Sequence, residues 1–205
     1  MPSPTDNARE ARRTDDKPRA GTLQTSRKAR ASGKTRTSRT TRTRRLTMSA
    51  MFACLALIFT YVEVLIPYSV GIPGVKLGLA NLVILIALYE MDARYALTIN
   101  LIRICLSGLL FSGLFAMLYS LAGGLISLAV MWALKRTGLF SMVGVSMAGG
   151  VVHNFGQVVV AAVIVENIRM FAYFPVLLFT GLAAGILMGI VAYIIDRSLP
   201  KQLFN

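Results

Sequence analysis

Between residues 47 and 196 the chain consists almost entirely of long apolar stretches, and this pattern constrains the fold more than any other feature. The stretches lie at about 47–66, 76–91, 94–113, 114–135, 141–165 and 173–196. A helix that crosses a membrane needs about 20 mostly apolar residues, because each residue adds about 1.5 Å to its length. The pattern predicts an all-α integral membrane protein, with a bundle of six transmembrane helices over residues 46–198.

Charge is distributed unevenly along the chain. Charged residues make up 15% of the sequence, compared with about 25% in typical soluble domains. Residues 1–47 contain 14 of the 22 Lys and Arg residues, so the apolar block that follows has too little charge to cover a soluble surface. This composition excludes a soluble globular enzyme. Cys54 and Cys105 lie inside apolar runs without a metal-binding spacing, so we expect no metal site and no cofactor.

Residues 1–45 are predicted to form a disordered basic cytoplasmic tail, and residues 199–205 a short cytoplasmic C-terminus. Ser, Thr, Arg, Lys and Pro dominate the tail, which therefore has almost nothing to bury against the entropy cost of ordering. Basic residues beside a membrane attract anionic lipid headgroups. We expect the tail to bind such headgroups but no specific nucleic acid, because it has no aromatic residues for base stacking.

The basic residues between the apolar stretches predict the orientation in the membrane. Lys and Arg are more frequent in cytoplasmic loops than in external ones. If both termini are cytoplasmic, the cations on the cytoplasmic side are Arg94, Lys135, Arg136, Arg197 and Lys201, and those outside are Lys76 and Arg169. The sequence therefore predicts a multi-pass protein of the cytoplasmic, or inner, membrane with both termini inside.

Arg103 lies near the middle of the third apolar stretch, where a charge costs about 2.5–3.5 kcal/mol on insertion scales. It must therefore face the interior of the bundle or a wet cavity. Two alternatives remain open: Arg103 binds a carboxylate or phosphate of a ligand bidentately, or it pairs internally with Glu63 or Glu166. Asn100 shares a helix face with Arg103 and is a candidate for the same cavity.

A second polar group lies inside the fifth apolar stretch, at His153, Asn154 and Gln157. His153 and Gln157 are four residues apart and share one helix face. Each of these side chains needs a hydrogen-bond partner in a dry medium. They either contact a solute or hydrogen-bond between helices, and the concentration of three polar groups favours contact with a solute.

A third group lies in and just after the glycine-rich segment that precedes the second stretch. Lys76 is predicted at an external mouth and Asn81 about a turn and a half further in, so both are candidate solute contacts. Alternatively, Lys76 anchors the chain at the membrane interface and Asn81 caps a neighbouring element. The candidate substrate-binding residues are thus Lys76, Asn81, Asn100, Arg103, His153, Asn154 and Gln157, and no catalytic residue is expected.

Small residues recur every four positions on two of the apolar stretches. The positions are Gly181, Gly185 and Gly189, and Ala116, Ser120 and Gly124. Small residues let two membrane helices approach closely. We expect this packing within the bundle, the alternative being a docking face for another membrane subunit.

Four motifs, in this order, resemble the Gx transporter family, which is often labelled heptaprenyl diphosphate synthase component I. They are Lys76–Asn81 (KLGLAN), Arg103 followed by Ser107–Gly113 (SGLLFSG), Tyr119–Gly124 (YSLAGG) and His153–Gln157 (HNFGQ). The resemblance covers residues 46–198, and the family is similar to the substrate-binding S components of energy-coupling factor transporters.

The resemblance implies a substrate-binding membrane subunit for a small vitamin-like or flavin- or isoprenoid-related solute. It also implies a transmembrane coupling subunit and cytoplasmic ATPases as partners, with small residues of the first helix facing the coupling subunit. Two pairs have an approximate spacing for this contact, Ser49–Ala53 and Ala50–Cys54. The chain has no Walker A motif, so ATP energy must come from partners.

The family label leaves an alternative, a non-catalytic membrane accessory subunit of a polyprenyl diphosphate synthase. Condensation of prenyl diphosphates needs aspartate-rich motifs that hold Mg²⁺. The acidic residues of the apolar block form no such motif; they are Glu63, Glu90, Asp92, Glu166 and Asp196. We therefore expect that the chain is not an enzyme by itself. A third possibility is a scaffold that anchors a partner through the basic tail.

Overall fold

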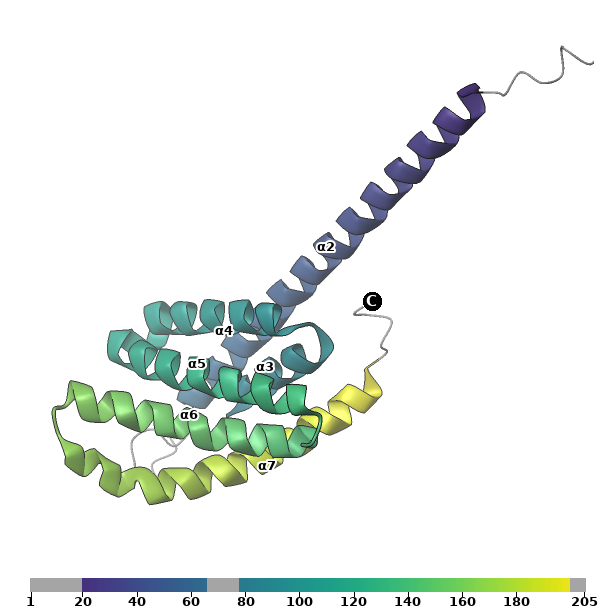
Figure 1. The fold of residues 1–205 in the computed structure, drawn as a ribbon. Coiled ribbons are helices and arrows are strands. Elements are labelled where there is room, and N and C mark those ends of the chain that lie inside the picture. Colours follow the sequence, from purple (N-terminus) through teal and green to yellow (C-terminus); the bar gives the residue numbers. More distant parts are fainter. Residues whose placement is uncertain (1–19, 66–77, 200–205) are drawn as a thin grey trace, which may run out of the picture. The chain divides into compact units, whose positions relative to one another are not determined.

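The computed structural model describes residues 20–65 and 78–199, and side chains from residue 43 onward. Its elements are α2 (Ala20–Leu65), α3 (Leu79–Glu90), α4 (Ala93–Ser107), the π-helical η1 (Gly108–Ser112), α5 (Gly113–Thr137), α6 (Met142–Ile164), the 3₁₀-helical η2 (Ile168–Tyr173) and α7 (Phe174–Ser198) (Figure 1). The described residues are thus helical throughout, apart from short connections, which confirms the predicted all-α class.

Within the residues that the structure describes, four helical stretches are long and apolar enough to cross a membrane. They are Thr43–Leu65, Ala93–Thr137, Met142–Ile164 and Ile168–Ser198. Large apolar side chains remain exposed on their outer faces, among them Ile58 at 56%, Val163 at 71% and Phe179 at 69%. A soluble protein does not expose apolar surface on this scale, whereas lipid accepts it without cost. The chain is therefore an integral, multi-pass membrane protein.

The stretch Ala93–Thr137 contains a chain reversal, as expected from the glycine between the third and fourth apolar stretches. Gly113 has a φ of 81° and a ψ of 165°, a conformation that no side chain favours. The Asn100 amide donates to the Gly124 carbonyl at 3.1 Å, although a straight helix would separate these residues by about 36 Å. Consequently α4 and α5 lie antiparallel and side by side, as Figure 1 shows.

The second predicted span, 76–91, is shorter in the structure. Helix α3 has 12 residues and begins after Gly78, which has a left-handed φ of 78°, while residues 66–77 lie outside the described part. Eight of the 12 residues of α3 are buried, including Leu85 and Leu88, and none of the others is fully exposed. A helix that is apolar on all sides belongs in the interior, and α3 contributes much of the apolar core of the bundle.

The predicted tail, residues 1–45, lies partly within helix α2, and its disorder stays a prediction. The backbone of residues 20–45 is helical and continuous with the first apolar stretch in α2. Extending an existing helix costs far less than starting one, and no proline follows Pro18 in this segment to stop it. The chain divides into two compact units, Met1–Thr43 and Arg44–Asn205. Residues 1–19 and the C-terminal residues 200–205 lie outside the described part.

Glycines allow α6 and α7 to pack against each other along their lengths. A Cβ placed on Gly185 would lie 2.7 Å from the Met147 Cα, and one on Gly189 would lie 2.8 Å from the Val143 Cα. These are backbone atoms that cannot move aside independently. The glycine repeat of α7 therefore packs within the bundle, which confirms the expected intramolecular role.

Candidate functional site

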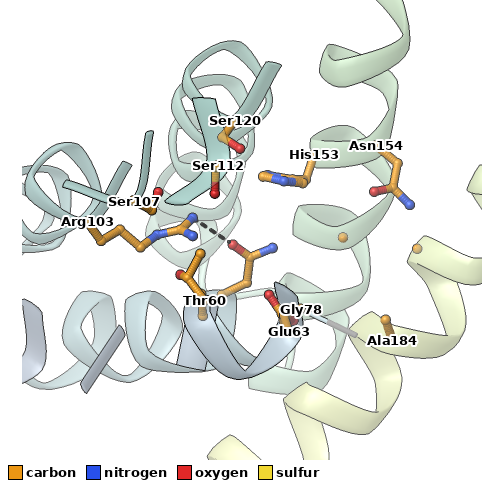
Figure 2. A pocket seen from close by; sticks show the side chains of 14 residues that line it. Thr60, Glu63, Gly78, Arg103, Ser107, Ser112, Ser120, His153, Asn154 and Ala184 are labelled. Atoms are coloured by element: carbon orange, nitrogen blue, oxygen red, sulfur yellow. Dashed lines mark hydrogen bonds between the residues drawn. The ribbon is translucent and has the colours of Figure 1, made fainter. Parts of the chain in front are cut away.

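A polar cavity of about 40 Å³ lies where the helices of the bundle meet (Figure 2). Every α-helix of the described part contributes to it, together with η1. Its lining residues are Thr60, Glu63, Gly78, Ala80, Asn81, Arg103, Ser107, Ser112, Ser120, Gly150, His153, Asn154, Gly181 and Ala184. Four of the seven predicted substrate-binding residues are among them: Asn81, Arg103, His153 and Asn154.

Arg103 is 6% exposed and points into this cavity (Figure 2). Its Nε donates to the Asn100 Oδ1 at 3.0 Å, and its Nη2 donates to the Asn81 Oδ1 at 3.3 Å. Asn100 in turn donates to the Gly124 carbonyl on α5 at 3.1 Å. The guanidinium is therefore held by neutral amides from two helices, and one of these amides is itself fixed by a third.

Both alternatives for Arg103 stay open, because the Glu63 carboxylate lines the same cavity and acts electrostatically on the guanidinium. In the described part of the chain, the hydrogen bonds of Arg103 go to the two asparagines. The Glu63 Oε1 accepts from the Leu79 backbone N–H at 2.7 Å. The first N–H groups of a helix have no partner within the helix and carry partial positive charge, so a carboxylate is well placed there. Glu63 thus connects α2 to the start of α3.

The three polar side chains on α6, His153, Asn154 and Gln157, have different surroundings. Figure 2 shows His153 directed into the cavity and Asn154 directed toward α7. The Asn154 amide donates to the Leu177 carbonyl at 2.7 Å, so this side chain joins two helices as well as lining the cavity. Gln157 does not line the cavity, and its Cγ lies 3.0 Å from where a Cβ on Gly123 would stand. The interhelical reading thus fits Asn154 best.

The other three predicted substrate-binding residues are Asn100, Asn81 and Lys76. Asn100 lies behind Arg103 and supports it rather than lining the cavity. Asn81 lines the cavity, and its Oδ1 accepts a hydrogen bond from Arg103. Lys76 lies outside the described residues.

Several lining residues were missed in the sequence because hydroxyl side chains are common in membrane helices. Thr60, Ser107, Ser112 and Ser120 all line the cavity. Ser107 is four residues after Arg103, so the helical period places both on one face and could have indicated it. Ser112 had no such signal, because the π-helical η1 changes the period there.

Comparisons with known proteins give one family. Residues 52–195 match the family model described as heptaprenyl diphosphate synthase component I. No curated protein and no solved structure matches the chain significantly. The matched range contains every described residue of the cavity lining.

Proposed function

Because the chain belongs to the heptaprenyl diphosphate synthase component I family, we propose that it is the substrate-binding membrane subunit of an importer of the energy-coupling factor type. Its substrate would be a small vitamin-like or flavin- or isoprenoid-related solute. The protein would lie in the cytoplasmic membrane with six crossings and both termini inside, as the distribution of basic residues favours.

One observation carries this proposal: a polar cavity inside an apolar bundle. Arg103 and His153 face it from different helices, and hydroxyl groups complete its lining. Polar and ionisable groups are expensive in a membrane interior and commonly mark a substrate pathway. Small-molecule sites are also commonly formed where several elements converge.

In the proposed mechanism, the solute enters from outside near the start of α3 and reaches the cavity below. The bundle then reorients against a transmembrane coupling subunit, and cytoplasmic ATPases supply the energy. Helix α2 supports part of this scheme. Ser49 and Ala53 are buried within the bundle, whereas Ala50 and Cys54 are exposed. The exposed pair is therefore the one available to a coupling subunit.

The test begins with the detergent-solubilised full-length chain and mass spectrometry of the small molecules that co-purify with it. The identified solute is then used to compare the wild type with Arg103→Ala. We expect the variant to lose most of its solute affinity, because the only described guanidinium of the cavity lining is removed. Full affinity in Arg103→Ala would remove this residue from the site, and absence of any specific solute would contradict the importer proposal.

The family description favours a second candidate, a non-catalytic accessory subunit of a polyprenyl diphosphate synthase. Coexpression with a soluble synthase partner separates the two proposals. Prenyl diphosphate synthesis that requires both chains supports the accessory role. Unchanged synthesis without this chain, together with solute binding, supports the importer.

A further inference from the structure

We infer that the cavity recognises an oxyanion, the carboxylate or phosphate end of the solute, and that Arg103 binds it while Asn81 and Asn100 act as positioning residues. This inference rests on the proposed function, because it specifies the chemistry of the same site. It makes the solute an anion at its buried end, whatever the remainder of the molecule is.

The first argument is the charge of the cavity wall. Arg103 keeps its charge at any physiological pH, and it is buried within the bundle. Its hydrogen-bond partners in the described residues are two neutral amide oxygens. Amides orient a guanidinium without neutralising it. The Glu63 carboxylate acts on Arg103 electrostatically from the same cavity, but its Oε1 accepts a hydrogen bond from the Leu79 N–H. An oxyanion entering the cavity would therefore meet a cation that is already desolvated, and this strengthens their attraction.

The second argument is the number of donors. A guanidinium has five N–H groups in a rigid fork, and the hydrogen bonds to Asn81 and Asn100 use two of them. The fork suits a planar carboxylate or a phosphate. Ser107, Ser112 and Ser120 line the same space, and their hydroxyls can donate to further oxygens of the anion.

The third argument is size. One water needs a cavity of about 10–15 Å³, so the cavity, with its volume of about 40 Å³, has room for a few waters or a group of similar size. That space suits a carboxylate or phosphate group and is too small for a complete flavin or prenyl chain. The remainder of a larger solute must lie outside this cavity, or the bundle must open further to admit it.

Glu63 decides which side of the cavity the anion occupies. Its carboxylate lines the same space, and its Oε1 accepts from the Leu79 N–H. Like charges repel, so the oxyanion belongs on the Arg103 side, away from the start of α3. Figure 2 shows Arg103 near Ser107 and Ser112, with Glu63 on a different helix.

The experiment measures thermal stability of the full-length chain in nanodiscs of phosphatidylcholine alone. The probes are acetate, methyl phosphate and acetamide, a neutral molecule of the same shape as acetate, with potassium chloride matching the ionic strength. A ligand that binds only the folded protein raises its melting temperature. We expect saturable stabilisation by acetate or methyl phosphate, and none by acetamide or chloride.

Three variants then assign the effect to Arg103. We expect Arg103→Gln to weaken oxyanion binding by at least about tenfold and Arg103→Lys to retain part of it. Arg169→Gln, which removes an exposed cation on η2, should bind as the wild type does. If Arg103→Gln fails to fold, the comparison of acetate with acetamide in the wild type still decides whether the cavity binds an oxyanion. Equal stabilisation by the two probes, or an undiminished shift in a folded Arg103→Gln protein, would overturn the inference.

A further arm separates a soluble anion from a lipid headgroup. Adding phosphatidylglycerol to the nanodiscs should leave the stabilisation by acetate or methyl phosphate intact if the oxyanion belongs to a soluble solute. Loss of that stabilisation, with Arg103-dependent stabilisation by phosphatidylglycerol itself, assigns the site to a lipid phosphate instead.

Oxyanion binding without import in the presence of coupling partners would contradict only the proposed function. Import of a neutral solute that is unaffected by Arg103→Gln would contradict only this inference.

Discussion

Asn100 shows how one amide controls a buried charge. It is 1% exposed, and its two polar ends are both engaged, with Arg103 on its own helix and with the Gly124 carbonyl on α5. A Cβ on Gly124 would lie 3.0 Å from the Asn100 Nδ2, so the glycine leaves space for this contact. Asn100 therefore sets both the direction of the guanidinium and the approach of two helices.

Asn100→Ala should lower the free energy of unfolding by about 2–3 kcal/mol, because it leaves a buried charged donor and a buried carbonyl without this partner. The measurement is reversible unfolding in mixed micelles. Thr98→Ala is the control, since Thr98 is exposed and bonds only to the Arg94 carbonyl of its own helix. A loss for Asn100→Ala no greater than that for Thr98→Ala would contradict the structural role.

At the scale of elements, the closest contact is the seam between α6 and α7. On Gly185 a Cβ would lie 2.7 Å from the Met147 Cα and 2.8 Å from the Ser146 carbonyl oxygen. Real Cβ atoms do not approach backbone so closely, so any side chain at this position must push the helices apart.

Gly185→Ala should destabilise the bundle by about 1–3 kcal/mol, the usual cost of overpacking. Gly144→Ala on α6 is the matched control, because its nearest neighbours would lie at 3.6 Å or more. Alanine is the better helix former, so Gly144→Ala should stabilise the protein slightly or leave it unchanged. In one unfolding assay, Gly185→Ala should thus lower the free energy of unfolding, and Gly144→Ala should not. Equal effects of the two substitutions would contradict this prediction.

A second contact between elements joins the ends of α3 and α5. The Lys135 Nζ donates to the Leu88 carbonyl at 2.6 Å and lies 4.9 Å from the centre of the Tyr89 ring. The last carbonyls of a helix have no partner within it and carry partial negative charge. Lys135 satisfies them for the short central helix.

Lys135→Met should lower the free energy of unfolding by about 1.5–3 kcal/mol, the usual range for a hydrogen bond to a charged group. Arg136→Met is the control, because the Arg136 guanidinium lies 5.0 Å from the Trp132 ring on the same helix, and an exposed contact of this kind is worth about 0.5–1 kcal/mol. Both are measured by thermal unfolding at one salt concentration. A larger effect for Arg136→Met would show that general charge loss, rather than capping, is responsible.

At the scale of the whole molecule, charge and apolar surface belong to different parts of the chain. The unit Arg44–Asn205 contains the long apolar helices and the cavity, whereas most of the basic residues precede it in the sequence. Two roles can therefore be separated by truncation, solute binding in the larger unit and attraction to anionic lipids in the smaller one.

Removing residues 1–45 should leave solute affinity within about twofold of the full chain, because none of the described lining residues of the cavity precedes Thr60. Preference for phosphatidylglycerol over phosphatidylcholine, measured by native mass spectrometry of bound lipid, should fall and become less sensitive to salt. Loss of solute binding on truncation would instead favour a scaffold that acts through the tail.

The apolar pattern was sufficient to predict the helices, because any segment that contacts lipid must satisfy its own backbone and expose apolar side chains. It also placed the reversal at Gly113, where only glycine adopts the required φ without strain. Local pattern could not decide which polar groups meet, because that depends on how each helix is rotated about its axis. Only the tertiary structure directed Arg103 to the amides of Asn81 and Asn100, and Asn154 to the carbonyl of Leu177. The π-helical turn brought Ser112 into the cavity by breaking the regular period, and no helical spacing in the sequence contains that shift.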